Sequence, residues 1–121
     1  MKDDNIIAIK TKMFAIRIIH MFQFLSTTYK GTLNVLFSQL LKSGTSIGAN
    51  VHEAINGQSR KDFEAKLNIA LKEASETEYW IDLLFETEYI KQSEYESIHS
   101  DCVEIIKILT AILNSSKKSA K

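Results

Sequence analysis

The chain contains no proline and only four glycines among its 121 residues. Proline breaks helix interiors, and loop-rich or sandwich folds use it freely at turns. A chain without it therefore favours long, uninterrupted helices. The sequence is 45% apolar, which is enough to build a core. Its length fits one domain and leaves little room for a second.

Four stretches carry apolar residues at steps of three and four, the spacing that gathers side chains on one face of a helix. Short joints between such stretches make successive helices antiparallel. The pattern therefore predicts an all-α fold, an up-and-down antiparallel four-helix bundle that occupies residues 1–121 as a single domain. The expected helices span about 6–29, 33–56, 60–89 and 94–114, and residues 115–121 form a frayed basic tail.

Two serines mark expected helix starts. Ser59 is followed three residues later by Asp62, and Ser93 by Glu96, which is the spacing of a capping box. In each of the four expected helices, the apolar repeat forms a stripe, here called a seam, that should face the core. The residues of the four seams are Phe14, Ile18, Met21, Leu25, Tyr29, Leu33, Phe37, Leu40, Gly44, Ile47, Val51, Ala54, Phe63, Leu67, Ala70, Ala74, Thr77, Ile81, Leu84, Tyr95, Ile98, Cys102, Ile105, Leu109 and Ile112.

Small residues concentrate in the second expected helix, where residues 43–50 read SGTSIGAN. Glycine in a helix interior costs about 1 kcal/mol relative to alanine. A helix that accepts Gly44 and Gly48 therefore indicates close approach of a neighbouring backbone. A phosphate-binding loop is disfavoured, because no Gly-Lys-Ser/Thr sequence follows.

The run QLLKSGTSIGANVHE, residues 39–53, resembles the four-helix-bundle family of 23S rRNA intervening-sequence proteins, also called S23-type proteins. The resemblance continues through Ser59, Asp62, Phe63 and Lys66, then through IALKEASETEYWIDLL, and covers roughly residues 14–113. Lys42 stands where the family motif has an arginine. Motif residues expected to serve structure or a subunit interface are Gly44, Gly48, Asn50, Glu53, Lys66, Glu73 and Trp80.

The resemblance implies a bundle that assembles into a ring, typically a homopentamer. Genes of such proteins can lie inside inserted segments of ribosomal RNA genes. A similar accessory protein of diversity-generating retroelements binds nucleic acid and a reverse transcriptase. We therefore expect a homo-oligomer, with RNA, DNA or a protein as its partner. We also expect Glu53 and Lys66 to form an ion pair where the second and third helices meet.

Charge is balanced overall, with 15 basic and 15 acidic residues, but it is uneven along the folded bundle. The end formed by residues 1–16, 46–73 and 105–121 carries eleven bases and six acids, and the opposite end has the matching negative surplus. A basic end can bind phosphates by releasing counterions, although solvated ends without a ligand are the simpler alternative. The candidate nucleic-acid contacts are Lys10, Lys12, Arg60, Lys61, Lys107, Lys117 and Lys118.

No catalytic or metal-binding pattern is recognisable. A di-iron bundle needs two Glu-x-x-His motifs, and this sequence has one, Glu96 to His99. The single cysteine, Cys102, excludes an internal disulfide and cysteine-rich zinc motifs. We expect no cofactor, no signal peptide and no membrane span, hence a cytoplasmic protein. The predicted function is a non-enzymatic oligomeric interaction module that binds rRNA or DNA at its basic end. The alternative is a protein-binding scaffold or accessory subunit without nucleic-acid contact.

Overall fold

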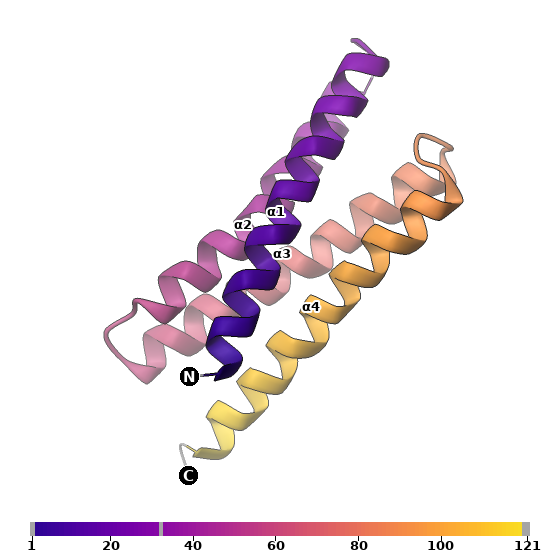
Figure 1. The fold of residues 1–121 in the computed structure, drawn as a ribbon. Helices are drawn as coiled ribbons and strands as arrows, with labels where there is room; N and C mark the ends of the chain where they lie inside the picture. Colours follow the sequence, from indigo (N-terminus) through magenta and orange to yellow (C-terminus); the bar gives the residue numbers. More distant parts are fainter. Residues whose placement is uncertain (1, 32, 120–121) are drawn as a thin grey trace.

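The computed structural model describes the backbone of residues 2–31 and 33–119, and the side chains of 5–31 and 33–118. Over these residues every regular element is an α-helix, and the helices pack as the predicted four-helix bundle (Figure 1). The four helices are α1 (Lys2–Thr28), α2 (Asn34–Ile55), α3 (Arg60–Glu86) and α4 (Gln92–Ser119).

Neighbours in the chain are also the closest neighbours in space. Helix α2 packs against α1 and α3, and α3 packs against α4, whereas α1 and α4 approach each other less closely. Helices α1 and α3 make no close backbone approach, so they occupy diagonal positions. Both chain termini lie at the same end of the bundle, together with the α2–α3 loop (Figure 1).

The core follows the predicted seams closely. Phe14, Ile18 and Leu25 from α1 and the aligned positions of the other helices are buried, and the seam residues Tyr29, Leu33, Phe63, Tyr95 and Ile112 are half-buried. Leu113 is buried in place of Ile112. Burial of this apolar stripe on each helix supplies the main favourable free energy of the fold.

The two glycines of α2 sit where α1 comes closest. A Cβ atom added at Gly44 would lie 2.8 Å from Cγ2 of Ile18, and one added at Gly48 would lie 3.2 Å from the backbone carbonyl oxygen of Thr11. Both distances are shorter than ordinary contacts. The small-residue stretch therefore permits tight packing of α1 on α2, as the sequence predicted.

Helix ends agree with the predictions in one case and differ in others. The amide of Asp62 donates to Oγ of Ser59 at 3.0 Å, so the predicted cap of α3 is confirmed. The predicted cap at Ser93 is wrong, because α4 begins one residue earlier, at Gln92. The carboxylate of Glu96 instead accepts a hydrogen bond from the Gln92 side chain at 3.1 Å.

Helices α3 and α4 also differ from prediction at their carboxyl ends. Helix α3 stops at Glu86, before the expected 89, because the chain turns there and Glu88 adopts a left-handed φ of 68°. Helix α4 continues through 115–119, where a frayed tail was expected, and residues 120–121 lie outside the described part. Lys117 and Lys118 fall in its last turn, where cations complement the negative end of the helix dipole. Over the residues that the structure describes, no helix is long and apolar enough to cross a bilayer.

Candidate functional site

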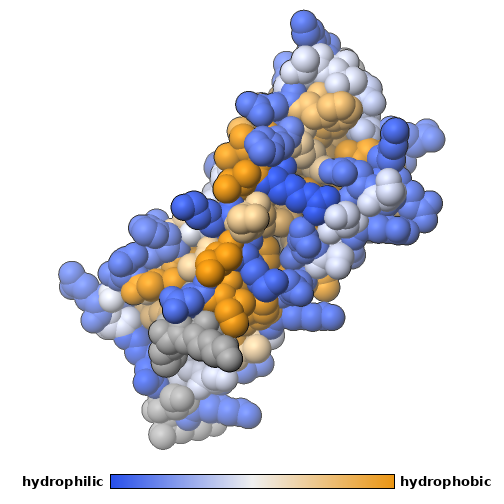
Figure 2. Space-filling view, viewed as in Figure 1, coloured by the Kyte–Doolittle hydropathy of each residue, from blue (hydrophilic) through white to orange (hydrophobic). Residues whose placement is uncertain are grey.

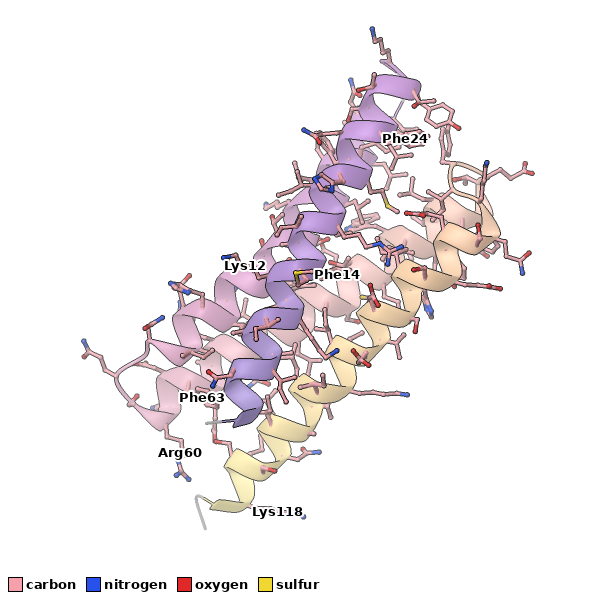
Figure 3. All side chains as sticks on the ribbon, in the orientation of Figure 1. Lys12, Phe14, Phe24, Arg60, Phe63 and Lys118 are labelled. Atoms are coloured by element: carbon pink, nitrogen blue, oxygen red, sulfur yellow. The ribbon has the colours of Figure 1, made fainter. Side chains whose placement is uncertain are left out.

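Four exposed cations gather at the end of the bundle that holds both termini. Arg60 and Lys61 open α3, and Lys117 and Lys118 lie in the last turn of α4. A hydrogen bond from Ser116 on α4 to the carboxylate of Glu64 on α3 joins the two helices there. Arg60 and Lys118 both extend from this end in Figure 3. We call these four cations the basic end.

The other predicted contacts do not join this cluster. Lys12 lies on the shaft of α1, about 15 Å along the helix from residue 2, at ~1.5 Å per residue (Figure 3). Lys107 lies a similar distance from Lys117 on α4. The ammonium group of Lys10 is paired with the carboxylate of Glu104 on α4. Among the described residues, no ion pair is recorded for the four cations of the basic end.

The expected ion pair between α2 and α3 is present. Nζ of Lys66 lies 3.0 Å from Oε1 of Glu53, and the two side chains are 39% and 56% exposed. This pairing removes Lys66 from the cations free to meet a phosphate. Asn50, another motif residue expected to serve structure or an interface, donates its side-chain amide to the Ser46 carbonyl of its own helix at 2.8 Å.

The remaining motif residues, Glu73 and Trp80, border an exposed aromatic surface on α3. Indole Nε1 of Trp80 donates to the Glu76 carboxylate at 3.2 Å, and its ring meets that of Tyr79 edge-on at 5.2 Å. Tyr79 is 57% exposed and Ile69, further along the helix, is 43% exposed. Burial and the nearby Glu76 raise the pKa of Glu73 above its ordinary value, against the opposite effect of two lysines.

A further apolar surface lies on the outward face of α1, and the repeats that predict the core do not include it. Ile9, Met13 and Phe24 are between 62% and 64% exposed, and Ile16 is 43% exposed. Figure 2 shows apolar residues gathered along this side of the bundle. The available signal was a second repeat in α1, at 6, 9, 13 and 16, offset from the core repeat.

A groove runs between α1 and α4, where the two helices stand apart. Ion pairs cross it from Arg17 to Asp101 at 2.9 Å and to Glu94 at 3.7 Å. Beyond this bridge, toward the α3–α4 loop, lies an open hollow of about 880 Å³. Its apolar lining is rich in aromatic side chains, contributed by Phe24, Tyr29, Phe85 and Tyr89.

A polar cluster links α3 to α4 on the outer side of the core. The phenol of Tyr95 donates to Asp82 at 2.8 Å, and this bond raises the pKa of Tyr95 to about 12. His99 Nε2 lies 2.9 Å from the carboxylate of Glu78. Nearby, burial together with surrounding carboxylates raises the pKa of the Cys102 thiol to about 12, so it carries no thiolate near neutral pH.

Glu96 and His99, which together resembled half of a di-iron motif, have different hydrogen-bond partners. Glu96 bonds Gln92, whereas His99 faces two carboxylates of α3, Glu78 and Asp82. Within the described part of the chain, no group of three or more histidine, cysteine, aspartate or glutamate side chains is arranged to hold a metal ion.

Fold and surface together define an all-α four-helix-bundle protein with a glycine-containing second helix, a basic end and an apolar outer face. Residues 3–111 match the family model of the 23S rRNA-intervening sequence protein, and the chain belongs to that family. It is similar to a solved structure from Bacteroides thetaiotaomicron, described as a protein of unknown function from the S23 ribosomal protein family. The two chains are 51% identical with a TM-score of 0.88, over 93% of this chain and 98% of that one. No curated protein matches the sequence.

Proposed function

We propose that this protein is a non-enzymatic, cytoplasmic module that assembles with copies of itself and binds nucleic acid through its basic end. The observation that carries the proposal is the convergence of Arg60, Lys61, Lys117 and Lys118 at one end of the bundle. Lysine and arginine side chains at such a surface attract the phosphate backbone and release its condensed counterions. Recognition by these groups is independent of base sequence, because it reaches only phosphates.

One copy presents a modest positive surface, since Glu53, Asp62 and Glu64 lie near the same end. Assembly would increase the number of cations that face one nucleic acid. Copies arranged side by side in parallel would combine their basic ends into one rim, and several weak contacts on one polyanion reinforce one another. Self-assembly and nucleic-acid binding therefore belong to the same proposal, and a homopentameric ring is the assembly that we expect.

The exposed outer face of α1 supports the self-assembly. Large apolar surfaces on a folded chain commonly mark contacts with other macromolecules. Ile9, Met13, Ile16 and Phe24 follow one side of a long, straight helix, which suits packing against another helical bundle. Light scattering on the purified protein tests this part. We expect a native mass several times the 13.8 kDa of one chain, and a monomer at micromolar concentration would contradict it.

Nucleic-acid binding is tested with fluorescently labelled fragments of 23S rRNA and duplex DNA of equal length. We expect binding that weakens steeply as salt rises. Two double variants, Arg60→Gln with Lys61→Gln and Lys117→Gln with Lys118→Gln, should each weaken binding and flatten its salt dependence. The matched control is Lys42→Gln with Lys91→Gln, which removes the same charge elsewhere. Absence of binding at low salt, or equal weakening in the control, would remove this part of the proposal.

The groove between α1 and α4 favours one alternative, a scaffold that binds a protein. Its aromatic lining and width would suit a helix or an extended apolar segment. A variant in this groove that lies off the outer face of α1, Phe85→Ser, distinguishes the two functions. Two results together would favour the scaffold. The unmodified protein would bind no nucleic acid at any salt concentration, and a protein that co-purifies with it would be lost from this variant.

A further inference from the structure

The exposed phenylalanine and tyrosine rings of the bundle lie away from the basic end. Phe24 is more than half exposed and lies near the opposite end of the bundle from Arg60 and Lys118 (Figure 3). Tyr79 is also more than half exposed and lies about 28 Å along α3 from Arg60, at ~1.5 Å per residue. Phe63, one turn into α3, is half-buried and packs against the hydrophobic core. The basic end therefore offers cations to a nucleic acid, with the exposed rings placed elsewhere.

The cations of the basic end come in two pairs from two neighbouring helices. They are Arg60 and Lys61 at the start of α3, and Lys117 and Lys118 in the last turn of α4. Packed helices have axes about 8–10 Å apart, so the two pairs are separated by about that distance. The major groove of B-DNA is about 12 Å wide. The spacing of the two pairs therefore suits phosphates on the two strands that flank a groove.

Contact with phosphates alone favours a duplex over a single strand. A duplex carries the higher density of charge, so each neutralised phosphate releases more of the condensed counterions. The logarithm of affinity falls with the logarithm of salt concentration by about 0.9 for each contacted duplex phosphate and by about 0.7 on a single strand. A single strand must also be ordered on a fixed set of cations, whereas a duplex already holds its phosphates in place. Proteins that bind single strands add aromatic rings on which the bases stack.

We propose that the basic end binds nucleic acid as a duplex, of RNA or of DNA, in preference to a single strand. The inference rests on the proposed nucleic-acid binding and adds the form of nucleic acid that this site takes. Two cations further along the bundle are already neutralised, Lys10 by Glu104 and Lys66 by Glu53. The phosphate contacts therefore concentrate on the four cations of the basic end, which have the spacing of a groove and hold no base.

The number of cations sets the size of the preference. Four phosphates contacted by one copy give duplex binding a log–log salt slope that is steeper by about 0.8 than that of single-strand binding. Where the two forms bind equally near ~1 M salt, this difference makes duplex binding about tenfold tighter at about 50 mM salt. Every further copy that contacts the same molecule adds its own four cations and widens the difference.

The test compares labelled probes of equal length: an RNA duplex, a DNA duplex and one unstructured strand of each. Fluorescence anisotropy over a salt series measures their affinity for the full-length protein. We expect each duplex to bind about tenfold more tightly than its strand at about 50 mM salt, with the steeper salt slope. Phe63→Leu and His52→Gln each remove a ring close to the basic end, the second at an exposed position in the last turn of α2. Both variants should bind all probes as the unmodified protein does, and circular dichroism checks their helix content.

The outcomes separate this inference from the proposed function. If no probe binds at low salt, nucleic-acid binding fails and this inference fails with it. If the strands bind as tightly as the duplexes, the proposed function stands and the duplex preference is overturned. A preference that holds for RNA alone, or for DNA alone, would show that groove shape is recognised and would overturn it as well. So would loss of single-strand binding in a folded Phe63→Leu or His52→Gln variant, because the ring would then be stacking on bases.

Discussion

The hydroxyl groups of Ser43 on α2 and Thr77 on α3 lie 2.9 Å apart and share a hydrogen bond in the core. Both residues are fully buried. Each hydroxyl also meets a carbonyl of its own helix, Leu40 for Ser43 and Glu73 for Thr77. Burying a polar group is tolerated when its hydrogen bonds are satisfied. This pair is thus a buried polar link between the two most extensively packed helices.

Thr77→Val keeps the shape of the side chain and removes the hydroxyl. We expect it to lower the free energy of unfolding by about 1–2 kcal/mol, because the buried Ser43 hydroxyl keeps only its long contact with the Leu40 carbonyl. The double variant with Ser43→Ala should lose less than the sum of the single variants, since no polar group is left unpaired. Urea unfolding measures all three. Thr110→Val, at an exposed position, is the control, and a loss there equal to that of Thr77→Val would contradict the prediction.

Gly44→Ala should destabilise the bundle, although alanine is ordinarily the better helix former. The new methyl group would lie 2.8–2.9 Å from two carbons of Ile18, so α1 must shift or Ile18 must leave its rotamer. Overpacking of this kind costs about 1–3 kcal/mol. Ala49→Ser, an exposed change on the same helix, should alter stability by less than about 0.5 kcal/mol. Thermal unfolding at equal or higher temperature for Gly44→Ala would show that the contact is unimportant.

The pKa of Tyr95 provides a test at alkaline pH. Its hydrogen bond to Asp82 needs the phenol proton, and the folded-state pKa of about 12 lies above the ordinary 10.0. The stabilisation is therefore complete below pH 10 and is lost as the pH rises through 12. We expect the stability difference between the unmodified protein and Tyr95→Phe to shrink over that range. Asp82→Asn should shift the phenolate absorbance titration to lower pH, and Asp101→Asn should leave it in place.

Cys102 offers a direct report on opening of the core. Its thiol is fully buried and its pKa is raised to about 12. We expect very slow reaction with a thiol reagent at mildly alkaline pH, and rapid reaction after unfolding. In a Cys102→Ala background, Ser100→Cys places a thiol at an exposed position of the same helix and should react at once. Comparable rates for the two thiols in the folded protein would show that the α3–α4 interior opens freely.

Much of the fold could be predicted from the apolar repeat. The seam through Phe14 and Ile18 identified the buried face of α1, and the seam through Leu67 and Ala74 did the same for α3. Ser59 could be identified as a helix cap because its hydroxyl can accept a hydrogen bond from the amide three residues later, at Asp62. Ser93 has the same spacing to Glu96, but α4 already begins at Gln92, directly after Lys91. The residue at which this helix begins depends on contacts outside the motif.

The surface was less predictable than the core. The Glu53 and Lys66 ion pair followed from antiparallel pairing of two helices about one short loop, so its prediction is confirmed. Pairing of Lys10 with Glu104 joins residues 94 positions apart, and no local pattern indicates it. The outward stripe of α1 is visible in the sequence as a second repeat. A repeat alone does not say which of two apolar faces the rest of the chain covers, and that depends on where α4 packs.

Gly44 and Gly48 have a consequence for the side of α1 that faces away from them, toward α4. They let α1 lie close to α2, whereas α1 approaches α4 less closely and the ion pairs of Lys10 and Arg17 span that side. A chain with larger residues at these positions would centre its first helix between both neighbours, and the hollow lined by Phe24 and Tyr89 would narrow.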